Sequence, residues 1–153
     1  MVGLLLPLAL FTGGIAGGTL VWSAIAGAPL LLSLPDERYV AVHQFFVARF
    51  DPLQPVCLLT ALACDLGLAF ANPGAGSRAL AGACAAVYAA VVFVSLTRNV
   101  PVNKWIAGLD PERLPEDWPS RDPRRRWRDW NLVRTWLAMV ALAGNAAMVA
   151  VLV

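Results

Sequence analysis

The chain has 153 residues, of which 59% are hydrophobic and only 14% are charged. A charged fraction so far below that of soluble domains is typical of a protein that lies in a lipid bilayer. The formal net charge is only +2 and there is no basic recognition module, which excludes a typical nucleic-acid-binding protein. The length suits one integral membrane domain covering residues 1–153.

The first apolar run covers residues 3–31 and exceeds the ~20 residues that cross a bilayer. It lacks the basic leader of a signal peptide, so we expect it to be retained. Pro29 and Pro35 are expected to end this helix. Glycines spaced four apart let a second helix backbone approach closely. We therefore expect close helix packing, and allow a homo-oligomer, through Gly13, Gly14, Gly17 and Gly18.

Residues 36–50 alternate apolar and polar side chains at helical spacing, which predicts an amphipathic helix at the membrane interface. Three further apolar runs, at 53–72, 77–98 and 131–152, are each long enough to span the membrane. The sequence thus predicts an all-α membrane protein: a four-helix transmembrane bundle with an interfacial helix and a polar cap, residues 99–130, between its third and fourth helices.

The basic residues are distributed very unequally between the two ends of this bundle. Of the twelve Lys and Arg residues, eleven lie in the segments 32–52 and 98–134, and the twelfth is Arg78. Basic loops stay in the cytoplasm, so we predict a multi-pass cell-membrane protein with both termini outside the cytoplasm. Trp105, Trp118, Trp127 and Trp130 fit an interfacial aromatic belt.

Two sequence blocks, NVPVNKW at 99–105 and RWRDWNLVRT at 126–135, carry a specific pattern. Together they resemble the anthrone oxygenase-like family, small four-helix membrane proteins catalogued as a domain of unknown function. The glycine-rich first helix and the stretch from Gln44 to Asp51-Pro52 are also similar to that family. The resemblance implies the fold, and it implies oxygenation of polycyclic aromatic compounds in natural-product pathways, in which an anthrone becomes an anthraquinone.

Asp65 is an ionisable residue inside an apolar run, where such residues are costly and tend to be functional. Counting ~1.5 Å per helical residue places Thr19, Tyr88 and Asn145 at a similar depth. We expect Asp65 to line an internal cavity and to act as a base, with Tyr88 beside it and Thr19 and Asn145 positioning a substrate. The alternative is a structural hydrogen bond from Asp65 to Asn145 or Tyr88.

A second polar group is expected at the basic end of the bundle. Taken singly, Asn131 is explained as a helix N-cap and Arg134 as a lipid-headgroup contact. As a group, the amides and the arginine are expected to line a polar mouth that binds the substrate or an anionic group. This group consists of Gln44, Asn99, Asn103, Asn131 and Arg134.

His43 is the one histidine, so a two-His-one-carboxylate iron site or a multi-histidine copper site cannot come from one chain. A haem or a metal with His43 as ligand is the alternative to a reaction without cofactor. The leading hypothesis is a membrane-embedded oxygenase that uses O2 on a lipophilic or aromatic small molecule. Oxidation at nitrogen is a close variant, and a non-catalytic membrane subunit or small-molecule-binding protein is the alternative from another class.

Overall fold

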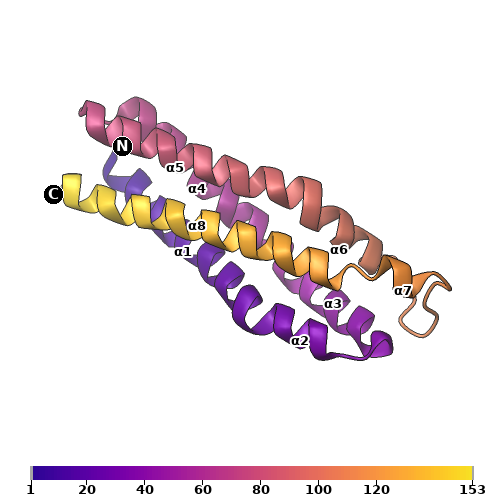
Figure 1. Ribbon diagram of the computed structural model, residues 1–153. Helices are drawn as coiled ribbons and strands as arrows, with labels where there is room; N and C mark the ends of the chain where they lie inside the picture. The colour runs from indigo at the N-terminus through magenta and orange to yellow at the C-terminus, as the bar shows by residue number, and fades with distance from the viewer. Residues whose placement is uncertain (1, 153) are drawn as a thin grey trace.

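The computed structural model describes residues 2–152 and holds helices but no strand within that range. Four helices are long and apolar enough to cross a membrane. They run side by side as an elongated bundle with both termini at one end (Figure 1). The all-α, four-helix membrane fold expected from the sequence is thereby confirmed.

The bundle consists of four rods, three of which are interrupted. The first joins α1 (Val2–Trp22), the π-helical turn η1 (Ser23–Gly27) and α2 (Ala28–Ser33). The second joins α3 (Asp36–Phe50) to α4 (Leu53–Ala71), and the third joins α5 (Ala75–Val94), the π-helical turn η2 (Ser95–Asn99) and α6 (Val100–Ala107). A loop with the short α7 (Trp118–Arg121) leads to the fourth rod, α8 (Arg124–Leu152). The rods pack in the ring order α1, α4, α5, α8.

Pro29 does not end its helix, contrary to expectation, and Pro101 is accommodated in the same way. Pro29 and Pro101 each lie at the start of an α-helix that directly follows a π-helical turn. A proline has no backbone N–H and its ring collides with the carbonyl four residues earlier. The wider π turn relieves both problems, because its hydrogen bonds reach five residues back, as from Val100 N to Ser95 O. The first rod therefore continues to Ser33, just past the expected limit of 31, and the third rod continues to Ala107, well past the expected limit of 98.

The fourth helix begins at Arg124, seven residues before the expected start at 131. The apolar pattern alone could not show this, because the first two turns of α8 are rich in arginine. Asn131 consequently lies inside α8, and its interpretation as a helix N-cap is wrong.

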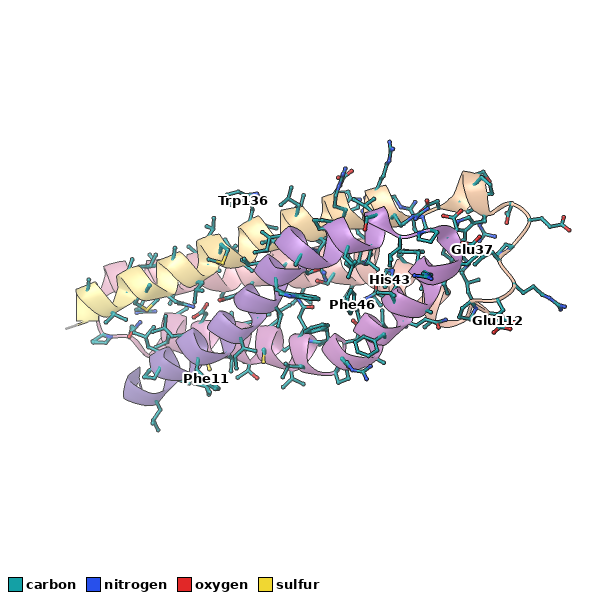
Figure 2. The ribbon with its side chains drawn as sticks, turned by 90° about the horizontal axis from the view of Figure 1, so that it is seen from below. Phe11, Glu37, His43, Phe46, Glu112 and Trp136 are labelled. Atoms are coloured by element: carbon teal, nitrogen blue, oxygen red, sulfur yellow. The ribbon has the colours of Figure 1, made fainter. Side chains whose placement is uncertain are left out.

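The bundle buries small residues at its centre and presents large apolar residues outward. Ala16, Ala61 and Ala138 are each fully buried, whereas Phe11, Phe93 and Trp136 are each about two-thirds exposed. Phe11 and Trp136 lie on the outer faces of the rods in Figure 2. Small residues let helix backbones approach closely, and the exposed apolar side chains suit contact with lipid.

The four glycines of α1 divide between two faces. A Cβ at Gly13 would collide with the Tyr88 hydroxyl, and one at Gly17 would touch Met139. A Cβ at Gly14 or Gly18 would meet nothing within 4 Å. Close packing within the bundle is thus confirmed for Gly13 and Gly17 and is wrong for Gly14 and Gly18. A homo-oligomer through these glycines stays a prediction.

The end of the bundle opposite the termini, which holds α3, α6 and α7, has its own apolar core. Trp118 and Trp127 are buried in this core, and Trp118 stacks on Trp105 with ring centroids 5.8 Å apart. Two of the four tryptophans expected in an interfacial belt therefore pack inside the protein. Trp127 in particular belongs to the site described below.

Candidate active site

Three of the four rods are interrupted next to one cavity. The interruptions are η1, η2 and the break between α3 and α4 at Asp51 and Pro52. Single π-helical turns often occur at functional sites, because they re-aim side chains and free backbone groups. Each interruption contributes a polar side chain to the cavity wall: Ser23, Ser95 and Asp51.

The cavity has a volume of about 370 Å³, within the range for small-molecule sites. Much of its wall is aromatic or aliphatic, as suits a lipophilic ligand. Figure 2 shows His43 and Phe46 of α3 at this level of the bundle. The aromatic lining residues are Trp22, Phe46, Phe50 and Trp127; the polar ones are Thr19, Ser23, His43, Asp51, Gln54, Ser95, Asn103 and Arg134.

One wall of the cavity holds the Asp51 carboxylate in a network centred on Asn103. The Asn103 side-chain amide donates to the two carboxylate oxygens at 3.2 and 3.3 Å. Its carbonyl oxygen Oδ1 accepts from Trp127 Nε1 at 2.9 Å and lies 3.2 Å from His43 Nε2. His43 Nδ1 lies 2.7 Å from the Tyr39 hydroxyl. The network thus joins α3, the α3–α4 break, α6 and α8.

The donors and acceptors of this network assign the state of His43. An indole N–H can only donate, so the Asn103 atom facing Trp127 must be its carbonyl oxygen. That oxygen can only accept, which places a proton on His43 Nε2 and leaves Nδ1 to accept from Tyr39. Burial lowers the pKa of His43 to about 4, in agreement with a neutral ring.

His43 is the one histidine that could bind a haem or metal, and its surroundings do not suit that role. Both ring nitrogens are hydrogen-bonded and the side chain is 1% exposed, so no ring nitrogen is free for a metal. Within residues 2–152, no group of three or more His, Cys, Asp or Glu side chains is arranged to hold a metal ion.

The state of Asp51 depends on two opposing effects. Burial raises the pKa of this carboxyl above its usual value, while the hydrogen bond from Asn103 and the positive charge of Arg134 act in the opposite direction. Burial has the largest effect. A carboxylate made more basic in this way, facing an apolar cavity, is suited to accept a proton from a bound ligand.

Another part of the cavity wall holds Arg134. Its side chain is 7% exposed and donates from Nη1 to Ser95 Oγ at 3.1 Å and from Nη2 to Asn131 Oδ1 at 2.6 Å. Asn131 in turn donates to Ser23 Oγ at 3.1 Å. α8 therefore bridges both π-helical turns through side chains. The interpretation of Arg134 as a lipid-headgroup contact is wrong, because the guanidinium is buried in the bundle.

The structure brings some of the predicted site residues to the cavity and places the others elsewhere. Thr19, Asn103 and Arg134 line it, and Asn131 supports Arg134 from behind. Gln44 instead donates to the Ile106 and Leu109 carbonyls at the end of α6, and Asn99 donates to the Trp127 carbonyl. The side chains of Gln44 and Asn99 therefore link the helices around the site and do not line the cavity themselves.

Asp65 forms a separate buried cluster and is not among the residues that line the cavity. Asn145 donates to Asp65 Oδ2 at 3.2 Å, and both side chains are fully buried. Tyr88 is also fully buried, and its hydroxyl faces Gly13 across the bundle. The hydrogen bond between Asp65 and Asn145, which was the structural alternative to a catalytic role, is present. A catalytic role for Asp65 or Tyr88 stays a prediction.

Sequence reasoning missed the role of Asp51, Tyr39 and Trp127. The signal for Asp51 was available: an Asp-Pro pair separates an amphipathic helix from an apolar run, which marks a break at the mouth of the bundle. Tyr39 precedes His43 by four residues on one helix, and Trp127 stands in the block at 126–135, but neither signal shows that the two side chains meet at His43 and Asn103.

Comparison with known proteins and families shows what this chain is related to. A match to curated proteins or to solved structures was not found. The sequence model described as anthrone oxygenase matches residues 43–144, which cover two thirds of the chain and include His43, Asp51, Asn103 and Arg134. Because the match spans three of the four rods and both charged walls of the cavity, this chain belongs to the anthrone oxygenase family.

Proposed function

We propose that the protein is a membrane oxygenase that uses the cavity to oxidise a lipophilic aromatic ketone of the anthrone type with O2. The observation that carries the proposal is a cavity of about 370 Å³ with aromatic walls, a half-buried carboxylate and a buried guanidinium. Family membership supports an oxygenase role. An apolar cavity among membrane helices suits a substrate that partitions from lipid.

The reaction begins with removal of a proton from the methylene group opposite the ketone. Asp51 accepts this proton, and the electron pair passes into the ring system and onto the ketone oxygen as an enolate. Such a base contributes typically 10²–10⁴-fold to the rate. Asn103 keeps the carboxylate aimed at the cavity, and His43 and Trp127 keep Asn103 in its orientation.

Dioxygen then oxidises the carbanion. The carbon gains a C–O bond, and the resulting peroxide takes up one proton to become a hydroperoxide. Loss of the second C–H proton and cleavage of the O–O bond release water and leave a new carbonyl. One CH2 and one O2 thus become one C=O and one H2O. Oxidation at nitrogen needs no carbon acid, so the carboxylate in the wall favours oxidation at carbon.

The proposal is tested with purified protein in detergent or nanodiscs and an anthrone as substrate. Oxygen consumption and quinone formation are measured against the spontaneous oxidation without protein. We expect one O2 consumed per quinone formed, and a 10²–10⁴-fold loss of turnover in Asp51→Asn. A wild-type rate equal to the spontaneous rate, with tight binding of the anthrone, would instead favour a non-catalytic binding protein.

A further inference from the structure

Arg134 contacts no carboxylate among the residues that the structure describes, although Asp51 lies in the same cavity wall. Its buried guanidinium donates to two neutral oxygens, and its Nε has no hydrogen-bond partner. It takes part in none of the ion pairs found among residues 2–152. Burying a cation without an ion-pair partner in contact is costly, and such groups are normally paired. The arginine therefore lacks an anion that a ligand in the cavity can supply.

Arg124, the other arginine at this end of the bundle that is not exposed, shows what Arg134 lacks. Arg124 pairs with Asp36 and Asp122, and its side chain is 13% exposed. The ionisable groups that share the cavity with Arg134 are Asp51 and His43. Asp51 is hydrogen-bonded to Asn103 and forms no ion pair with Arg134, and His43 is neutral. The cation and the carboxylate are thus kept apart in one cavity.

The other residues that line the cavity indicate what kind of molecule carries the anionic oxygen. Trp22, Phe46, Phe50 and Trp127 offer aromatic surface, and the volume suits a few fused rings. An Arg guanidinium binds oxyanions through parallel N–H groups and is more weakly hydrated than an ammonium. Each Nη of Arg134 keeps one proton that its hydrogen bonds to Ser95 and Asn131 do not use, and these protons can bind an oxygen of a ligand in the cavity.

We propose that Arg134 binds the oxygen of the ligand as an oxyanion, so that the site takes enolisable aryl ketones and their phenolic tautomers. The same anion forms when the ketone loses a C–H proton or when the phenol loses its O–H proton. Arg134 therefore holds the oxygen on which charge gathers after Asp51 has removed the carbon-bound proton. Aromatic ethers and hydrocarbons, which cannot form this anion, are excluded from tight binding.

This inference rests on the proposed function for the location of the site and for the reaction, but its test needs no turnover. The probes are 9-phenanthrol, a stable planar phenol, and its methyl ether, 9-methoxyphenanthrene. Binding to the purified protein is followed by quenching of tryptophan fluorescence, because Trp22 and Trp127 line the cavity. Ionisation of the bound phenol is followed by the absorption of the phenolate.

We expect the phenol to bind at least about tenfold more tightly than the ether, which corresponds to ~1.4 kcal/mol. We also expect the bound phenol to ionise at a pH about one unit lower than in empty detergent micelles, because a cation favours the charged form. Arg134→Gln should remove both effects, Arg134→Lys should keep part of them, and Arg78→Gln, at the opposite end of the bundle, should change neither.

Equal affinity for phenol and ether in the wild type overturns the inference, whatever the variants do. So does an unshifted phenol ionisation in wild-type protein to which the probe is bound. The wild-type comparison keeps the test decisive if Arg134→Gln does not fold. A wild type that oxidises anthrone but shows no preference for the phenol contradicts the oxyanion site alone. A wild type that prefers the phenol but does not consume O2 contradicts the proposed function alone.

Discussion

The Asn103 side chain donates its amide to the Asp51 carboxylate at 3.2 Å, although the two residues lie 52 positions apart in the chain. This hydrogen bond stabilises the ionised carboxylate and so lowers the pKa of Asp51, against the larger effect of burial, which raises it. The position of one side chain on α6 thus moderates the increase in the pKa of the proposed catalytic group that burial causes.

Replacing Asn103 with Leu should move the pH profile of the reaction. The base must be ionised, so kcat/KM falls as the pH drops through the pKa of Asp51. Loss of the amide donor raises that pKa, and the acidic limb should shift to higher pH. The control is Gln44→Leu, which removes hydrogen bonds to α6 without touching Asp51. An acidic limb that stays in place in Asn103→Leu would contradict the role of Asp51.

His43 should make the stability of the protein depend on pH. Its pKa is about 4 in the folded protein and near 6.5 when exposed, so the unfolded chain binds more protons between these values. The folded state should therefore lose stability as the pH falls from about 6.5 towards 4. In His43→Gln the thermal unfolding midpoint in detergent should change less over this window. Identical pH dependence of both proteins would show that His43 does not titrate between the two states.

The hypothesis that Asp51 is the base and the hypothesis that Asp65 is the base predict opposite effects of replacing each residue with Asn. With Asp51 in that role, Asp65→Asn should keep turnover within a few-fold, because the new amide still offers an oxygen to Asn145. Asp51→Asn should lose turnover by 10²–10⁴-fold. A folded Asp65→Asn protein that is inactive, beside an active Asp51→Asn, would transfer the catalytic role to Asp65. Steady-state rates with an anthrone decide between them.

Substitutions at Gly13 and Gly14, two adjacent positions on different faces of α1, test how this helix packs. Gly13→Leu should lower the thermal unfolding midpoint markedly, because even a Cβ there collides with the Tyr88 hydroxyl. Gly14→Leu should leave the single chain stable, since a Cβ there meets nothing within 4 Å. A Gly14→Leu protein with a smaller size in detergent would show that this outer face holds two copies together. Equal loss of stability in both variants would contradict the assignment of the two faces.

The orientation of the bundle in the membrane can be tested at Ser120. This exposed residue of α7 lies at the end of the bundle that holds most of the basic residues. The positive-inside rule places it in the cytoplasm. A cysteine at Ser120, in a chain whose three buried cysteines are replaced by Ala, should resist a membrane-impermeant reagent in intact cells and react after lysis. Strong labelling before lysis would invert the topology.

The sequence by itself determined the four spans, the amphipathic segment and the family. These follow from local properties: a run of about twenty apolar residues needs lipid, and Arg134 and Asn103 stand in short blocks that can be recognised without a structure. Asp65 and Asn145 were also paired by counting along straight helices, because α4 is continuous and regular between its ends.

Only the tertiary structure decided which polar side chains share a cavity. Each residue of an α-helix turns the side-chain direction by about 100°, so a wider π turn before Pro29 or Pro101 rotates everything beyond it. The packing of α3 against α6 brings His43 to Asn103 from 60 positions away. The hydropathy pattern of the sequence does not reveal these changes in side-chain direction. They come from the contacts among the rods, and those contacts place a carboxylate and a guanidinium in the walls of one cavity.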